Sequence, residues 1–326
     1  MIELPLLKIY PGRYVVLVCF LLFSLPLFSQ KPVNDKPLTR EIGIAVDNDY
    51  PFMTDQYYTA GQDFYYRFLT SSKIPFFPKS DSTKTIVGFH YGNKVFNPKN
   101  LDTQDPYLMD RPYCGWNFIS AEIQQFKNKN SGNFYSLQVG VVGKESGMGE
   151  LQQWWHQAIQ LYAVEGWDSQ ISNEVVVNLN YIHAHAVTLG KDAEIVSSTG
   201  AWLGTGSNKI SQEFTLRLLK FNPLRESSFL SARLTQARNT RNREFFFFGS
   251  AAVDYVISNI FIQGSLFNDN PSPFTTSINP WFMNTKIGIQ YSSNRISCSA
   301  AIVHLSKETE WVSEHNYASA SIAYRY

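Results

Sequence analysis

The chain has 326 residues, of which 15% are aromatic and 17% charged, and its formal net charge is +1. It contains no basic stripe and no cluster of Lys and Arg, which excludes an ordinary nucleic-acid-binding protein. Three cysteines are too few for a disulfide framework. Cys19 lies near the N-terminus, and whether Cys114 and Cys298 pair stays open at this point.

Residues 1–29 have the layout of a secretory signal peptide. Arg13 supplies a positive charge, residues 15–28 form an almost unbroken apolar run, and Ser29 is a small residue at a suitable cleavage position. A transmembrane anchor is the alternative, but it needs about 20 apolar residues. Because the run is short and Pro26 interrupts it, we expect a signal peptide over residues 1–29 and an exported domain over residues 30–326.

Apolar residues alternate with polar or small ones along most of the remaining chain, as in the segment FTLRL at residues 214–218. This period of two is typical of β strands that have one apolar face. Candidate strands begin near residues 39, 61, 84, 114, 134, 173, 211, 229, 245, 258, 281, 295 and 317. We expect one of these to be a loop, which leaves about twelve strands, because single-chain bacterial barrels have even strand numbers.

A β sandwich and a β barrel both alternate, but two features favour a barrel. The last expected strand, residues 317–326, ends on the aromatic Tyr326, which is typical of outer-membrane barrels. The polar face of several strands carries charged or amide side chains such as Arg67, Asn178 and Arg217, which suit a wet lumen better than a dry core. We therefore predict an all-β fold, an antiparallel transmembrane β-barrel of about twelve strands in the bacterial outer membrane.

One segment departs from the strand pattern. Residues 149–163, GELQQWWHQAIQLYA, carry Leu151, Trp155 and Ile159 at helical spacing, and Gly166 follows as a stop signal. A helix between two barrel strands predicts an outer-loop element or a lid.

The first candidate for chemistry is a polar cluster early in the chain. Asp47, Asn48, Asp49 and Asp55 place three carboxylates and an amide within nine residues, and Thr59 follows closely. Oxygen ligands of this kind suit a hard cation such as calcium. The alternative is an ordinary polar hairpin loop, because Asn, Asp and Thr are common in turns.

One further cluster contains a candidate general base, and another contains a candidate phosphate-binding arginine. Gln152 and His156 are four residues apart and share one helix face, and histidine is the commonest general base. Arg111, in the segment DRPYCGW, is suited to gripping a phosphate. For His156 the alternative is a surface histidine on an amphipathic helix. For Arg111 the alternative is a turn that leads into a strand with interfacial aromatic residues.

The fourth candidate is Glu174, in the segment EGWDSQISNE. It has the same parity as Val176 and Asn178, so we expect it to face the lumen, where it could ligate a cation or orient a histidine. A simple lumen carboxylate is the alternative. No Gly-x-Ser-x-Gly, His-Glu-x-x-His or phosphate-binding glycine loop accompanies these clusters.

Four stretches, VDNDYPFMTDQYYTAG, DRPYCGW, GELQQWWHQ and EGWDSQISNE, occur in this order and together resemble the outer-membrane lipid A 3-O-deacylase family. The resemblance implies a twelve-stranded barrel with its site near the outer leaflet, between the barrel wall and a loop helix. It further implies a calcium-dependent esterase that removes the 3′-linked acyloxyacyl chain of lipid A.

Carried over residue by residue, the resemblance assigns roles to five side chains, of which we expect His156, Gln152 and Asn48 to be catalytic. His156 matches the general base that activates water, and Gln152 its neighbour in the site. Asn48 and Asp49 match the polar pair near the metal and the oxyanion. Arg111 matches a basic residue near the phosphate or sugar of lipid A.

The remaining assignments concern the metal and the substrate. We expect Asp47, Asp49 and Glu174 to hold the calcium ion that stabilises the oxyanion. The basic residue expected beside the arginine of the second stretch is missing, so Lys94 or Lys99 could stand in for it in phosphate recognition. We assign Lys94 and Thr59 to substrate binding.

Two other functions stay open on the sequence alone. The chain could be a non-catalytic barrel, either a channel or a binding protein, or a hydrolase of another membrane lipid such as a phospholipid. For the deacylase hypothesis we expect a monomer whose partner is lipid A or lipopolysaccharide in the outer leaflet, with no nucleic acid.

Overall fold

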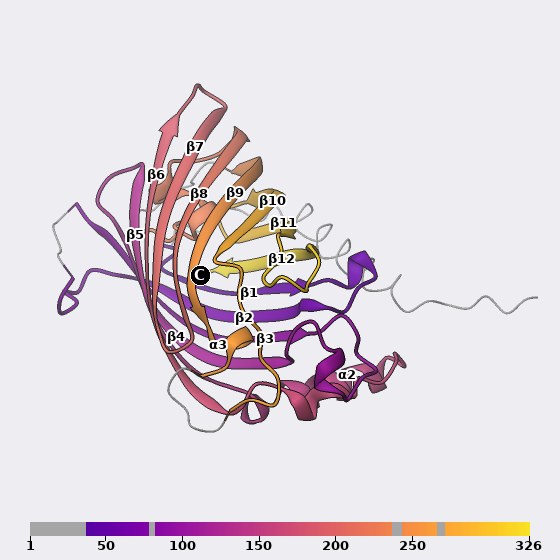
Figure 1. The fold of residues 1–326 in the computed structure, drawn as a ribbon. Helices are drawn as coiled ribbons and strands as arrows, with labels where there is room; N and C mark the ends of the chain where they lie inside the picture. The colour runs from indigo at the N-terminus through magenta and orange to yellow at the C-terminus, as the bar shows by residue number, and fades with distance from the viewer. Residues whose placement is uncertain (1–36, 78–81, 237–242, 266–270) are drawn as a thin grey trace, which may run out of the picture.

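Twelve antiparallel strands form a closed barrel in which each strand pairs with its chain neighbour and β1 pairs with β12 (Figure 1). The computed structural model describes residues 37–77, 82–236, 243–265 and 271–326, so the expected signal peptide lies outside the described residues. The strands are β1 (Arg40–Asn48), β2 (Tyr57–Thr70), β3 (Lys84–Asn97), β4 (Cys114–Phe126), β5 (Ser131–Val142), β6 (Glu174–Thr188), β7 (Ala193–Gly204), β8 (Ser207–Lys220), β9 (Glu244–Asn259), β10 (Trp281–Ser292), β11 (Ile296–Leu305) and β12 (His315–Arg325).

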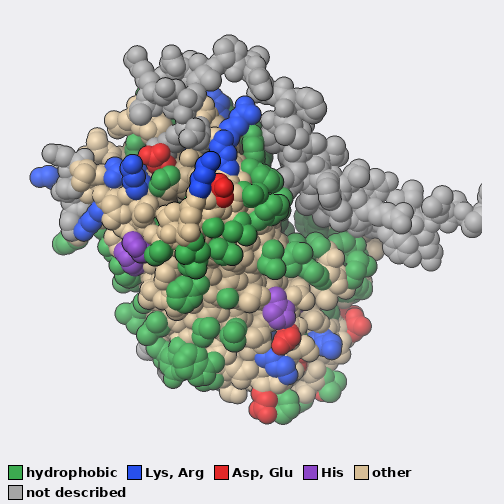
Figure 2. All heavy atoms as spheres, turned by 90° about the horizontal axis from the view of Figure 1, so that it is seen from above, with side chains coloured by type: hydrophobic (Ala, Val, Ile, Leu, Met, Phe, Trp, Pro, Cys, Tyr) green, Lys and Arg blue, Asp and Glu red, His purple; other side chains and the backbone are tan. Residues whose placement is uncertain are grey.

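The strand pattern sorts side chains between the outer face of the barrel and its lumen. In β6, Val175, Val177 and Leu179 are 59%, 39% and 59% exposed, whereas Val176 and Asn178 are buried. Figure 2 shows hydrophobic side chains spread across the middle of one face, with charged side chains gathered towards its upper and lower edges. An apolar band between polar ends is what a lipid-facing barrel requires. In the described part of the chain no helix is long and apolar enough to cross a bilayer.

The two ends of the barrel differ in their links. We call the end at which β1 begins and β12 ends the terminal end, and the opposite end the loop end. Links at the terminal end cover residues 71–83, 127–130, 189–192, 221–243 and 293–295. Links at the loop end cover residues 49–56, 98–113, 143–173, 205–206, 260–280 and 306–314.

A plug formed by residues 223–235 folds into the lumen at the terminal end. Leu224, Ala232 and Leu234 are fully buried there, and Ala232 and Leu234 pack with Ile86 of β3. The ammonium group of Lys84 donates to the carbonyls of Arg225, at 2.9 Å, and of Ala232, which ties the plug to the wall. Apolar packing of this kind leaves the terminal end of the lumen filled.

Three details differ from the sequence expectation. The strand expected near residue 229 is a single 3-10 turn, Ser228–Leu230, within the plug. The strand expected near residue 258 is the end of β9, which runs on to Asn259. A strand not expected, β7, begins at Ala193. The total of twelve nevertheless agrees with the prediction, and Cys114 and Cys298 are both free and buried.

The predicted loop helix is present but shorter than expected. α2 spans Met148–Ala158, and Gln160 has a φ of 56°, so the backbone has left the helix well before Gly166. The early end lets residues 160–164 fold back beside the helix. α3 (Ile260–Gln263) is a single further turn at the loop end.

Candidate active site

α2 packs against the outer side of the barrel wall at the loop end, beside β3 and β4 (Figure 1). Val95, Tyr113, Met148 and Trp167 form a buried apolar cluster between helix and wall. Gly115 permits the close approach, because a Cβ there would lie 2.3 Å from the Ser146 hydroxyl oxygen. The helix is therefore held against the wall rather than over the lumen.

The helix turns two polar side chains towards the wall and apolar ones outward. Gln152 and His156 are only 8% and 5% exposed, whereas Trp154 and Trp155 are 59% and 49% exposed. Exposed tryptophans are typical of the membrane interface, where one end of the ring is apolar and the other wet. The polar pair thus lies in a sheltered position beside a surface suited to lipid.

Asp55, in the link between β1 and β2, is the centre of this polar cluster. Its Oδ2 lies 3.0 Å from His156 Nε2 and accepts a hydrogen bond of 3.0 Å from the Tyr162 hydroxyl. Its Oδ1 accepts from three more side chains, Thr59 at 2.7 Å, Asn97 at 2.8 Å and Gln152 at 3.1 Å. Five polar side chains from four parts of the chain therefore converge on one carboxylate.

The two ring nitrogens of His156 have different partners. Nδ1 lies 3.0 Å from the Tyr162 carbonyl oxygen, and since a carbonyl only accepts, Nδ1 carries a proton. Nε2 is then the nitrogen that gains or loses a proton, and it faces Asp55. Burial lowers the pKa of His156, but the hydrogen bonds to Asp55 and to the Tyr162 carbonyl raise it by more, so this pKa lies above its ordinary value.

A β-bulge in β2 places one hydroxyl group between Asp55 and a second carboxylate, that of Asp49. The register between β2 and β3 shifts between Tyr58 and Ala60, which leaves Thr59 as the extra residue. The Thr59 hydroxyl lies 2.8 Å from Asp49 Oδ1 as well as within hydrogen-bond distance of Asp55. Burial raises the pKa of Asp49 to about 7, and the nearby charge of Asp55 adds to this effect, although hydrogen bonds to the carboxylate oppose it.

Trp167 fixes the orientation of Gln152. Its indole N–H donates a buried hydrogen bond of 2.9 Å to Gln152 Oε1, so the amide nitrogen of Gln152 is the end that points to Asp55. An amide with its oxygen held in this way cannot flip without leaving a buried acceptor unpaired.

We predict that Trp167→Phe lowers the free energy of unfolding by about 1–3 kcal/mol, because it leaves Gln152 Oε1 buried without a donor. Urea unfolding in detergent micelles measures the change. Trp311→Phe is the matched control, since Trp311 is 69% exposed. Equal effects of the two substitutions would contradict the role assigned to the indole N–H.

The structure brings Asp49, Thr59, Gln152 and His156 into one cluster, as expected for site residues, but it separates the others. Asp47 and Lys94 lie on the lumen side of the wall. There Asp47 accepts a 2.8 Å hydrogen bond from Tyr58, whose ring lies 5.6 Å from the Lys94 ammonium. Asn48 has the outward parity of β1, and its side chain accepts from the backbone N–H of Tyr50 at 2.8 Å. These three do not contact His156 in the described residues.

Arg111 and Glu174 also lie apart from the cluster. Arg111 is fully buried and pairs with Glu308 at 3.0 Å. Glu174 begins β6 with the lumen-facing parity that the sequence predicts, but it makes no contact with His156 or Asp49 among the described side chains. Within those residues no group of three or more His, Cys, Asp or Glu is placed to hold a metal ion, so the predicted set of Asp47, Asp49 and Glu174 is not assembled.

Three members of the cluster, Asn97, Tyr162 and Trp167, were not singled out by the sequence, and Asp55 was named in the first polar cluster but given no role in the site assignment. Asp55 stood in the first polar stretch, but it could not be told from an ordinary turn residue. Asn97 is the last residue of β3, and an amide at a strand end carries no signal of its own. Tyr162 falls within the longer helix expected over residues 149–163, so its return towards Asp55 was not foreseen.

The family model described as outer membrane protein LpxR matches residues 15–326. The chain belongs to the LpxR family. This confirms the family expected from the four motifs, that of the outer-membrane lipid A 3′-O-deacylases, together with the barrel fold and the outer-membrane location. No curated protein sequence matches the chain.

A solved LpxR structure has the same fold. LpxR from Salmonella typhimurium aligns with a TM-score of 0.69 and 16% sequence identity, and the match covers 88% of this chain and 100% of that chain. The β domain of the Bordetella autotransporter BrkA gives a TM-score of 0.43 with 7% identity over 89% of this chain and 99% of that chain. The likeness to the LpxR structure, at this identity, concerns the fold alone.

Proposed function

We propose that this chain hydrolyses the ester that links the 3′ acyloxyacyl chain to lipid A, with His156 as the general base. Membership of the LpxR family implies lipid A 3′-O-deacylation. The observation that carries the assignment of the base is the contact of His156 with Asp55 on the outer side of the barrel wall, beneath the exposed tryptophans of α2. A lipid in the outer leaflet can reach this side of the wall without entering the lumen, if the loop end faces outward.

The contacts of His156 suit the transfer of a proton from water. The Tyr162 carbonyl holds the proton on Nδ1, so neutral His156 presents the lone pair of Nε2. Once Nε2 has taken a proton from the attacking water, Asp55 stabilises the imidazolium, which can return the proton to the departing sugar oxygen. In the absence of substrate His156 Nε2 lies 3.0 Å from Asp55 Oδ2. The attacking water must therefore displace Asp55 from Nε2 before it can bond to that nitrogen.

The oxygen atoms around Asp49 and Asp55 suit a calcium ion, which takes roughly 6–8 oxygen ligands. Both carboxylates share the Thr59 hydroxyl, and Asn97 Oδ1 is buried beside Asp55 without a hydrogen-bond partner in the part of the chain that the structure describes. We infer that these four side chains would hold the ion, in place of the ligand set expected from the sequence. A bound calcium ion would stabilise the negative charge of the tetrahedral oxyanion.

The test is acyl release from purified lipids by the mature protein in mixed micelles, followed by mass spectrometry. We expect lipid A to lose its 3′ acyloxyacyl group and a phospholipid to stay intact. Chelation of calcium should abolish release, and added calcium should restore it, because the two carboxylates lose their cation. The plug at the terminal end opposes the alternative of an open channel.

Each other outcome selects a different function. Unchanged lipid A with cleaved phospholipid would make the chain a hydrolase of another lipid. No acyl release from either would favour a non-catalytic barrel. Release that persists at full rate in chelator would remove calcium from the proposal and leave the base in place.

A further inference from the structure

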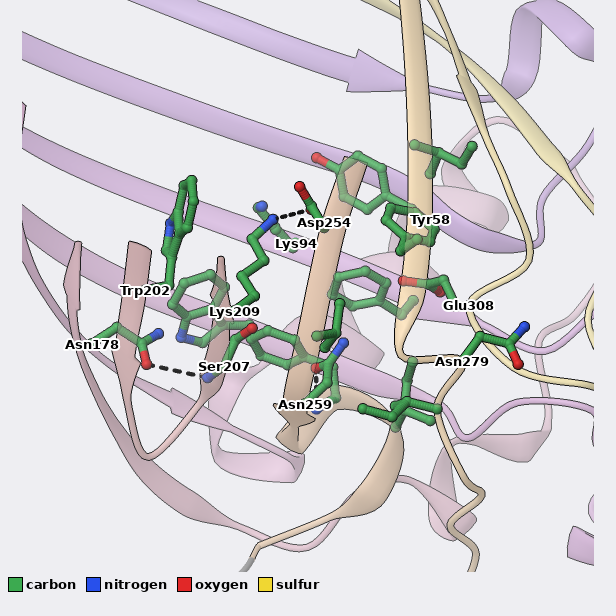
Figure 3. Close-up of a pocket in the computed structure, with 18 of the residues that line it drawn as sticks. Tyr58, Lys94, Asn178, Trp202, Ser207, Lys209, Asp254, Asn259, Asn279 and Glu308 are labelled. Atoms are coloured by element: carbon green, nitrogen blue, oxygen red, sulfur yellow. Dashed lines mark hydrogen bonds and ion pairs between the residues drawn. The ribbon is translucent and has the colours of Figure 1, made fainter. Parts of the chain in front are cut away.

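The loop half of the lumen contains a second polar site, which the wall separates from His156. It is a cavity of about 250 Å³ roofed by α3 and lined by side chains from strands on opposite sides of the barrel (Figure 3). Lys94, Lys209 and Trp202 lie close together in this cavity. None of its lining residues belongs to the cluster around Asp55.

One cation in this cavity, Lys94, has no direct ion pair among the described residues, although the lumen carboxylates of Asp47 and Asp63 are near enough to act on its charge. Lys209 pairs with Asp254 at 2.5 Å, and Glu308 pairs with the buried Arg111 at 3.0 Å. Both carboxylates that line the cavity are therefore neutralised. Lys94 makes no hydrogen bond or ion pair with any described residue, and its ammonium lies over two aromatic rings, 5.6 Å and 5.8 Å from their centres.

A buried donor points to the same conclusion. Trp116 is 4% exposed and lines the cavity, and its indole N–H has no hydrogen-bond partner among the described residues. A buried donor left unpaired is destabilising, and a ligand acceptor would relieve that cost. An unpaired ammonium beside an unpaired N–H is a favourable environment for an oxyanion.

The rest of the lining fits a sugar ring attached to that oxyanion. Trp202 offers an aromatic face, and Gln138, Asn178 and Asn279 offer amides that can bind hydroxyl groups. A volume of about 250 Å³ accommodates a ligand of about the size of one monosaccharide. We propose that this lumen cavity binds a monosaccharide-sized ligand that carries a phosphate or carboxylate, with Lys94 as its countercharge.

The experiment titrates the mature protein in detergent micelles with four probes: glucose 6-phosphate, glucuronate, glucose and inorganic phosphate. Because Trp116 and Trp202 line the cavity, binding should change tryptophan fluorescence, and calorimetry gives the affinity. We expect saturable binding of the two charged sugars, and affinity that falls as salt is added. Lys94→Met should weaken that binding about tenfold or more, whereas Lys94→Arg keeps the charge and should retain most of it.

Lys191→Met, in the exposed link between β6 and β7, is the matched control and should bind like the unchanged protein. Unchanged heat-dependent gel mobility shows that each variant is folded. The proposal is overturned if none of the charged sugars binds, if glucose binds as tightly as glucose 6-phosphate, or if Lys94→Met binds normally. Inorganic phosphate binding as tightly as glucose 6-phosphate would overturn the sugar part of the assignment.

Discussion

Replacing His156 by glutamine is expected to lower the rate of acyl release from lipid A by about 10²–10⁴-fold, the usual contribution of a positioned acid or base. Glutamine is close to histidine in size and can still bond to Asp55 or to the Tyr162 carbonyl, so the loop around α2 should keep its shape. What it cannot do is accept a proton from water. The loss should therefore appear in kcat, with little change in KM.

The measurement is the initial rate of acyl release in mixed micelles, with circular dichroism to confirm the fold. His185→Gln is the matched control, because His185 is exposed on β6 far from α2 in the chain. A fall of only a few-fold for His156→Gln, no larger than that of the control, would show that another group activates the water. The proposed base would then be wrong even if lipid A were still the substrate.

The barrel could be predicted because its signal is repeated in every strand. Alternation alone gave most strand starts, and it failed where apolar residues serve another purpose. Ser228–Leu230 has the composition of a strand start, but its apolar side chains pack into the plug. β7 was missed because Ser197, Ser198 and Gly200 replace the alternating apolar residues in its middle.

Residues of the active site could be predicted only where they share one helix or strand, because their spacing in the sequence then indicates a common face. Gln152 and His156 share a face of one helix, so their spacing was enough. Their partner Asp55 depends on contacts between distant segments. It receives hydrogen bonds from Asn97, 42 residues away, and from Tyr162, 107 residues away. No local pattern records such pairings, which arise only when the β1–β2 link and α2 are brought together by the closed barrel.

A second large effect is expected at the terminal end, where Glu194→Gln should lower the free energy of unfolding by about 3–5 kcal/mol. Glu194 and Arg217 are 3% and 0% exposed, and the arginine donates to the carboxylate through two of its nitrogens. Removing the negative charge leaves a buried guanidinium without its main countercharge. Urea unfolding in micelles, followed by tryptophan fluorescence, measures the loss.

The controls separate charge from packing. Glu310→Gln removes a carboxylate from an exposed loop position and should change stability by less than about 0.5 kcal/mol. The double substitution of Glu194→Leu with Arg217→Met removes both charges, so it should lie closer to the unchanged protein than Glu194→Gln does. It will not recover everything, since Arg217 also donates to the Ser227 hydroxyl and the Asn222 carbonyl.

Aromatic rings also surround this guanidinium, and they offer a rival explanation of its stability. Arg217 lies 4.7 Å, 5.2 Å and 5.1 Å from the ring centres of Phe221, Phe229 and Phe246. A cation over an aromatic ring gains about 0.5–2 kcal/mol, less than a buried carboxylate supplies. Phe229→Leu should therefore cost about 1–2 kcal/mol, clearly less than Glu194→Gln. If the order of the two effects were reversed, the rings rather than the carboxylate would be what holds Arg217 in the lumen.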